Sequence, residues 1–215
     1  MEIELTACNA LPLDLNGFNP NAHLPFGLNL DPIRKSMEDF LDFLTFINLQ
    51  LHTRKMRRLE RIIMQANFSS LVGEFIKAHI PDYCPSLVHN KYHNGHPDLI
   101  PANTFPNDAV QHADVGIEIK SSRYMRGWQG HNPENTWLMV FVYDSNSPED
   151  GDPVRPFRFT MVVGAALAKE DWTFSGRSAQ SRRTITASVN RSGYDKMMTN
   201  WVYREPRLNQ KETTV

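Results

Sequence analysis

Apolar positions in the first part of the chain recur at helical spacing. Asp31-Pro32 combines an N-cap residue with proline at the first helical position, which predicts the start of a helix. One apolar stripe follows, formed by Ile33, Met37, Phe40, Leu41, Leu44 and Ile47. In residues 52–68 basic side chains then surround further apolar ones. We therefore expect one long helix, or two, between residues 32 and 66.

A further helix is expected from Ser69-Ser70, because the run LVGEFIKAHI that follows has apolar residues at helical spacing. Pro81 should end this helix. Residues 6–30 have a different pattern, since they are rich in Asn, Pro and Gly and show no sustained period. We expect residues 1–30 to form an irregular N-terminal arm over the domain.

Further along, the chain is loop-like except for the short apolar step in HPDLIP. The period then changes from helical to extended. Three short runs are rich in β-branched or aromatic residues, namely DVGIEIKSS (114–122), TWLMVFVYD (136–144) and PFRFTMVVGAAL (156–167). Because the second run is apolar on both faces, it predicts a central strand covered on both sides. A last extended run, residues 182–190, precedes a short helical segment at 192–203.

This order of elements predicts an α/β fold, or α+β, with one central mixed β-sheet flanked by helices and a helical N-terminal part. We expect a single domain from residue 31 to residue 215. Within it, residues 31–80 should be helical, residues 96–167 should form the sheet core, and residues 168–215 should form a basic C-terminal part. A chain of 215 residues is long enough to bury a core without a disulfide or metal.

Composition narrows the class of protein. A hydrophobic fraction of 40% and a charged fraction of 22% exclude a disordered or fibrous chain. The start of the chain lacks the basic and apolar regions of a signal peptide, and no apolar run is long enough to span a membrane. The two cysteines, Cys8 and Cys84, suit a reducing compartment. We therefore expect a cytoplasmic protein that does not contact a membrane.

Charge alternates along the chain although the formal net charge is only -1. Residues 1–50 and 92–154 are acidic, with net charges of -5 and -6. Residues 51–91 and 155–215 are basic, with net charges of +4 and +6. Basic flanks around an acidic centre suit a protein that holds a phosphate backbone with its flanks and cations with its centre. Chance variation in blocks of this size explains the pattern equally well.

Candidate chemistry lies in two short segments, HPDLI and GIEIKSS. Side chains two positions apart on a strand share a face, so Glu118 and Lys120 should project together, away from the buried isoleucines. If Asp98 turns toward the same face, two carboxylates and the carbonyl of Ile119 supply oxygen ligands suited to Mg2+. Lys120 would then lie where an attacking water loses its proton. Such a cluster fits phosphodiester hydrolysis.

The two segments resemble the motif of the PD-(D/E)xK nuclease superfamily, whose fold is shared by many restriction endonucleases and by several recombination and repair nucleases. The matching residues are Pro97-Asp98 and Glu118-Ile119-Lys120, and the resemblance covers roughly residues 69–144. It implies a restriction-endonuclease-like fold. The implied metal ligands are Asp98, Glu118 and the carbonyl of Ile119, and the implied catalytic residues are Asp98, Glu118, Lys120 and Glu74.

Each implied role has an alternative. Glu118 and Lys120 would also suit a solvated strand face on which they form an ion pair. The apolar residues around them favour a central strand, where a buried carboxylate needs a metal or a partner. By the resemblance Glu74 is an auxiliary acid on the helix behind the sheet. Its alternative is a position in water at the helix boundary.

Polar and basic segments after the motif are candidate DNA contacts. Ser122, Arg123, Arg126 and Gln129 lie in a Gly-containing loop that directly follows the strand. Arg177, Arg182, Arg183 and Arg191 lie among Ser, Thr, Gln and Asn, the side chains that bind phosphates and base edges. The alternatives are a surface turn for the loop and ion pairs with surface acids for the arginines.

Two other groups of residues suggest simpler roles. Arg54, Lys55, Arg57 and Arg58 are expected to form a solvated helix face. Cys84, His89, His93 and His96 have loose metal-ligand spacing, which leaves a structural zinc site as one interpretation. We favour the other interpretation, a polar loop leading to the active site.

Together these features predict a Mg2+-dependent endonuclease of double-stranded DNA, most similar to a type II restriction enzyme. Cutting two strands at a defined site needs two active centres, so we expect a homodimer. The sequence has no Gly-rich phosphate loop, so we expect no nucleotide cofactor. The alternatives are a recombination or repair nuclease that recognises DNA structure, a non-catalytic DNA-binding protein of the same fold, and a zinc-stabilised interaction domain.

Overall fold

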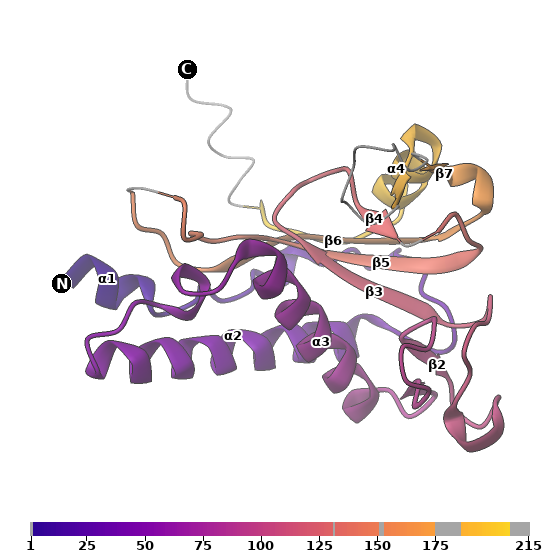
Figure 1. Cartoon of the computed structure of the whole chain (residues 1–215), viewed down its shortest axis with the longest axis horizontal. Coiled ribbons are helices and arrows are strands. Elements are labelled where there is room, and N and C mark those ends of the chain that lie inside the picture. The colour runs from indigo at the N-terminus through magenta and orange to yellow at the C-terminus, as the bar shows by residue number, and fades with distance from the viewer. Residues whose placement is uncertain (1, 131, 151–152, 175–185, 207–215) are drawn as a thin grey trace, which may run out of the picture.

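The computed structural model of the chain is shown in Figure 1. It describes all residues except 1, 131, 151–152, 175–185 and 207–215. Two long helices cover one face of a twisted sheet, and a smaller sheet with a short helix lies on its other face (Figure 1). The predicted mixed α/β architecture with a mixed central sheet is confirmed.

The two long helices are α2 (Leu30–Thr53) and α3 (Gln65–Tyr83). Asn29 caps α2 by accepting a hydrogen bond from the backbone N–H of Asp31. The predicted apolar stripe of α2 faces the core, where Ile33, Met37, Phe40, Leu41 and Leu44 are buried. Both helices therefore pack against the sheet along their apolar sides.

Several expected helix boundaries are wrong. The N-cap of α2 is Asn29 rather than Asp31, because the Asn29 side chain provides the capping oxygen. Helix α3 begins at Gln65 rather than near Ser69, so that buried Phe68 extends its apolar side.

Helix α2 is one helix and stops at Thr53, whereas residues 54–64 form turns and the short helix η2 (Leu59–Arg61). Lys55 has a φ of 57°, in the left-handed region, which a right-handed helix cannot continue through. Pro81 lies inside α3, which continues to Tyr83; the helix ends within one turn of the proline, which cannot donate the helical hydrogen bond at its own position.

One arginine of the basic run after α2 is buried. Arg54, Lys55 and Arg57 are exposed, as expected for a solvated face. Arg58 is only 1% exposed, which contradicts that expectation. Its guanidinium donates hydrogen bonds to Glu60 Oε1 at 2.6 Å, to Asn146 Oδ1 at 2.8 Å and to the carbonyl of Arg155 at 3.0 Å. A buried charge persists when it is paired and fully hydrogen-bonded, and Arg58 meets that condition.

The N-terminal arm is less irregular than expected. It contains α1 (Glu2–Ala7) and the short helix η1 (Leu15–Gly17). As expected, it lies over the domain, since Asn19 N–H donates to the carbonyl of Val202 at 3.0 Å and Leu11 N–H to that of Phe157 at 2.8 Å. These two hydrogen bonds hold the arm against the edge strand of the sheet and against the residue that precedes another strand.

The central sheet has six strands in the order β1 (Leu87–His89), β2 (Leu99–Pro101), β3 (Ile117–Ser122), β5 (Thr136–Asp144), β6 (Arg158–Leu167) and β9 (Trp201–Arg204). Strands β3 and β5 are parallel, and all other neighbours are antiparallel. Strand β5 lies between β3 and β6, and only its last residue is not buried. The predicted doubly covered central strand is therefore confirmed.

A second sheet of three strands lies on the face opposite to α2 and α3, in the order β4 (Gln129–Gly130), β8 (Ala187–Val189) and β7 (Trp172–Phe174). Helix α4 (Arg191–Thr199) follows it. The helical segment expected at 192–203 is therefore too long, because Trp201–Arg204 forms β9 and pairs with β6. Val202 and Tyr203 are fully buried there, so packing against the open edge outweighs helical spacing.

The two faces of the central sheet bury separate apolar clusters. Ile117, Ile119, Met139 and Phe141 belong to the cluster beneath α2 and α3. Leu138, Val140 and Val163 belong to the cluster beneath Trp128, Trp172 and Met197 on the side of the small sheet. Alternate residues of β5 thus enter different cores, as its doubly apolar sequence requires. Within the described part of the chain, no helix is both long and apolar enough to cross a membrane.

Candidate active site

The residues of the predicted motif meet where β2 and β3 begin to pair. Leu99 of β2 lies opposite Ile117 of β3 in an antiparallel register, which sets Asp98 beside Glu118. The predicted shared face of Glu118 and Lys120 is observed, since Lys120 Nζ donates a hydrogen bond to Glu118 Oε1. The isoleucines that alternate with them are buried in the core. The strand alternation therefore places this pair as the sequence predicted.

Asp98 is fastened to both β3 and α3. Its Oδ2 accepts a hydrogen bond from the Ile119 N–H at 2.9 Å, and its Oδ1 accepts one from Lys77 Nζ at 3.1 Å. Burial raises the pKa of Asp98, and the charge of Glu118 raises it further, while the two nearby lysines oppose both effects only in part. A carboxylate in this position gains stability from any added cation.

Glu118 lies between two positively polarised groups. One oxygen binds Lys120, and the other, Oε2, lies 2.9 Å from His96 Nδ1. Although burial raises the pKa of Glu118, the hydrogen bond from His96 and the charge of Lys120 lower it to about 2. Burial lowers the pKa of Lys120, but Glu118 outweighs that effect and the pKa is raised. Glu118 is thus an anion at neutral pH, held by the Lys120 ammonium and by a hydrogen bond from His96.

Glu74 reaches this group only through a lysine. Its side chain, on α3, is 66% exposed, and its Oε1 lies 2.7 Å from Lys77 Nζ. The same Lys77 ammonium binds Asp98, so Glu74, Lys77 and Asp98 form a chain of alternating charge. Glu74 lies largely in water, as the alternative proposed, but in the middle of α3 rather than at its boundary, and Lys77 separates it from Asp98.

Two polar cavities open on this group. The larger, of about 710 Å3, is bordered by His96, Asp98, Glu118, Lys120 and Tyr92, among others. The smaller, of about 160 Å3, lies between α3 and β3, and Glu74, Lys77, Asp98 and Lys120 border it as well. Charged groups of both signs line the two cavities. This lining suits a charged ligand such as a phosphate together with a cation.

The loop after β3 leaves some of the predicted DNA contacts free and ties down others. Arg126 and Gln129 are exposed, and Ser122 is half-buried at the end of β3. Arg123 forms an ion pair with Asp150, which partly neutralises its charge. Trp128 is buried, and its indole N–H donates to the carbonyl of Tyr124 at 3.0 Å. The loop is therefore an exposed turn anchored by one tryptophan.

Of the four C-terminal arginines predicted to contact DNA, the structure describes one. Arg191 is 87% exposed on α4, and its side chain pairs with Asp195 at 2.8 Å. This contact is the surface ion pair that the sequence allowed as an alternative. Arg177, Arg182 and Arg183 lie outside the described residues.

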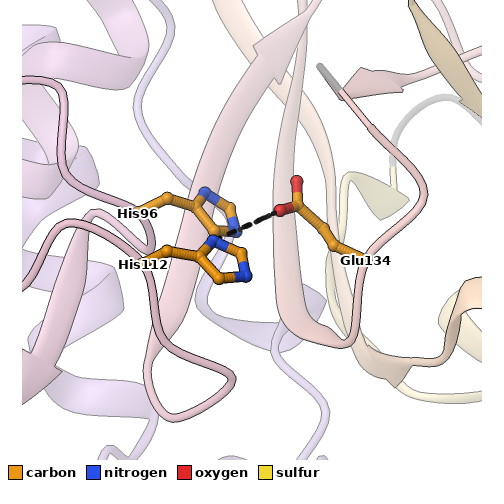
Figure 2. A group of neighbouring side chains, drawn as sticks. All are labelled: His96, His112 and Glu134. Carbon is orange, nitrogen blue, oxygen red and sulfur yellow. Dashed lines mark ion pairs between the residues drawn. The ribbon is translucent and has the colours of Figure 1, made fainter.

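The four candidate zinc ligands do not converge. Cys84 is buried and its Sγ lies 3.2 Å from Ser86 Oγ, whereas His89 and His93 are exposed. Among the described residues, one group of His, Cys and acidic side chains is close enough to share a metal ion. It contains His96 together with His112 and Glu134 (Figure 2). Sequence spacing did not indicate the last two residues, because they lie on separate loops.

The site as a whole offers two carboxylates and a backbone carbonyl beside a lysine, in a polar cavity. Such a group can hold a hard divalent cation and orient a water molecule. No protein-family model, no curated protein and no solved structure matches the chain.

Proposed function

We propose that the protein is a Mg2+-dependent endonuclease of restriction-endonuclease-like fold that hydrolyses phosphodiester bonds in double-stranded DNA. The observation that carries the proposal is the convergence of Asp98, Glu118 and Lys120 on one polar cavity. Asp98 joins the other two residues from a different strand, through its hydrogen bond to the Ile119 N–H. The mixed sheet, with α3 behind β3, agrees with the fold that the motif implies.

The residues fit Mg2+ by their chemistry. Asp98 and Glu118 offer carboxylate oxygens, and Ile119 offers its carbonyl oxygen, so all three ligands are hard donors. The raised pKa of Asp98, which has burial and Glu118 as its causes, marks a place where added positive charge is favourable. When bound there, Mg2+ would stabilise negative charge on the phosphate and on the leaving oxygen.

Lys120 has the role of orienting the attacking water. Its pKa is raised by Glu118 despite burial, so at neutral pH the ammonium donates hydrogen bonds and does not accept a proton. Glu118 holds the ammonium in place, and Lys77 holds the Asp98 carboxylate. In the reaction the water oxygen would bond to phosphorus as the bond to the leaving oxygen breaks. The attacking water would lose one proton to solvent, and the leaving oxygen would gain one proton from solvent.

Cleavage of duplex DNA at a defined site would require one such centre for each strand, so the proposal includes a homodimer. Arg126, in the loop after β3, and Gln129, which begins β4, are both exposed and would contact the substrate. A recombination or repair nuclease that recognises DNA structure would need the same catalytic residues but not a symmetric dimer.

The proposal is tested by incubating the purified protein with bacteriophage and plasmid DNA, with Mg2+ or with EDTA. The Lys120→Ala variant is the test variant, and Lys91→Ala is its control, since Lys91 is exposed and pairs only with Asp108 on the surface. Discrete bands that need Mg2+ and Lys120 would support a site-specific endonuclease. A smear with the same requirements would favour the repair nuclease.

Absence of cleavage of any DNA, whether unmodified, modified or branched, would overturn the proposal. Binding of duplex DNA without cleavage would then favour a non-catalytic DNA-binding protein. Cleavage that survives Lys120→Ala would contradict the assigned site even if the protein is a nuclease.

A further inference from the structure

A second group of side chains lies directly behind the proposed active site. His96 Nε2 lies 3.1 Å from Glu134 Oε2, and His112 Nδ1 lies 3.9 Å from the same oxygen (Figure 2). One ligand atom of each residue lies within 4.8 Å of those of the other two. The three residues come from three loops, which precede β2, β3 and β5.

The two nitrogens of the His96 ring differ in their contacts. Its Nδ1 lies 2.9 Å from Glu118 Oε2, so this nitrogen is the donor to Glu118. Its Nε2 is buried and, despite the nearby Glu134 carboxylate, makes no hydrogen bond to any described residue. With Nδ1 engaged by Glu118, Nε2 and the Glu134 oxygen face each other across a short gap, where one metal ion could bind both.

We propose that His96, His112 and Glu134 form a binding site for a zinc-class divalent metal ion. Two imidazoles and one carboxylate are a ligand set that Zn2+ takes in proteins, with a fourth position for water. Ligands that lie about 2.0 to 2.2 Å from a tetrahedral zinc lie about 3.3 to 3.6 Å from each other. The distances of 3.1 and 3.9 Å fall on either side of that range.

The geometry around the three ligands agrees with a metal site. A metal-bound histidine usually donates its other N–H to a carboxylate, a backbone carbonyl or a water, and His96 has such a partner in Glu118. The rings of His96 and His112 lie nearly parallel, with an angle of 14° between them, so both turn toward Glu134. The His112 side chain is 57% exposed and provides an entry path for the ion, whereas Glu134 is 14% exposed.

This site differs from the proposed Mg2+ site in its ligands and therefore in its metal. Imidazole ligands suit Zn2+, Co2+ and Ni2+, whereas Mg2+ prefers oxygen. An excess of Mg2+ should therefore leave the site unchanged. The inference does not depend on the nuclease proposal, since it requires only His96, His112 and Glu134.

The test is titration of Zn2+ into the full chain after treatment with EDTA and dialysis, measured by calorimetry. We expect saturable binding of one Zn2+ per chain that an excess of Mg2+ does not displace. His112→Gln and Glu134→Gln should each weaken binding by roughly tenfold or more. His93→Gln is the matched control, because His93 is an exposed histidine on the same loop as His96, and this variant should bind Zn2+ as the wild type does.

Zn2+ should also raise the melting temperature of the wild type, but not that of His112→Gln. Since His112 is largely exposed, this variant should fold, as circular dichroism would verify. Asp98→Asn should still bind Zn2+ even if it abolishes cleavage, which separates failure of one proposal from failure of the other. Absence of saturable binding, or wild-type affinity in both His112→Gln and Glu134→Gln, would overturn the inference and leave an ion pair between His96 and Glu134.

Discussion

His96 Nδ1 lies 2.9 Å from Glu118 Oε2, so a side chain of the loop before β2 holds that loop against β3. Two residues later the same loop contacts β3 again, since Asp98 Oδ2 accepts a hydrogen bond from the Ile119 N–H. These two contacts fix the loop against β3 at the place where the candidate chemistry lies. The segment His96-Pro97-Asp98 therefore anchors its loop to β3 in addition to providing the Asp98 carboxylate.

The exposed position of Glu74 predicts a small role in cleavage. Glu74 touches Lys77 but not the other members of the candidate site, and its side chain lies mostly in water. We expect Glu74→Gln to lower the rate of cleavage by roughly tenfold or less, against a loss of roughly a hundredfold or more in Lys120→Ala. Single-turnover cleavage rates of the two variants check this ranking. Equal losses would show that Glu74 acts directly.

Burial of Arg58 predicts a large loss of stability when its charge is removed. Arg58→Met leaves Glu60 buried without its ion pair, and the loss should be about 3 to 5 kcal/mol in the free energy of unfolding. The neighbouring Arg57 is exposed, so Arg57→Met should change the stability by about 0.5 kcal/mol or less. Urea denaturation of both variants measures the difference. Similar values for the two would contradict the described packing.

Asp171 predicts a stability contribution that depends on pH. Burial raises its pKa, but hydrogen bonds from Lys196, from the backbone N–H of Ala168 and from Ser192 outweigh it, and the pKa is lowered below the ordinary value. For a lowered pKa the contribution is complete above the unfolded value of 3.8 and disappears as the pH falls through the folded value.

Asp171→Asn should therefore cost about 2 kcal/mol at neutral pH and much less in strong acid. Urea denaturation of the wild type and the variant at about pH 7 and at about pH 3 tests the sign. Asp195→Asn is the control, because Asp195 lies on α4 next to Lys196, the partner of Asp171, and its side chain is 53% exposed. A difference between wild type and Asp171→Asn that grows toward acid would refute the assignment.

The arginines of the loop after β3 should contribute unequally to DNA binding. Arg126 is exposed, whereas Asp150 neutralises part of the charge of Arg123. Arg126→Ala should therefore weaken binding to duplex DNA and lower the dependence of log Kd on log salt by about 1. Arg123→Ala should have the smaller effect on that slope. Filter binding in the absence of Mg2+ measures both, and an equal or larger change for Arg123→Ala would contradict the prediction.

The sheet and the core of the candidate site were predictable because their signals are local. Alternation within β3 alone determines that Glu118 and Lys120 share a face, and a run apolar on both faces alone identifies β5 as central. The proximity of Asp98 came instead from the resemblance of two short segments. The structure supplies its physical reason in the register of Leu99 with Ile117.

The remaining features depend on contacts between distant segments, which no local pattern contains. Arg58 lies in a basic run and looks like its neighbours, but Glu60 and Asn146 bury it. His112 and Glu134 become neighbours of His96 only when three loops fold together. Strand β9 has helical spacing in sequence, and it becomes extended because the edge of β6 is open to it.

The central claim is that Asp98 and its partners carry out Mg2+-dependent hydrolysis of DNA. The most direct test is the rate of cleavage by Asp98→Asn under conditions in which the wild type cuts. We expect the rate to fall by roughly a thousandfold or more while the protein stays folded and still binds duplex DNA. Asp108→Asn, which alters a carboxylate on an outer loop, should cut as the wild type does. Cleavage by Asp98→Asn at the wild-type rate would contradict the account.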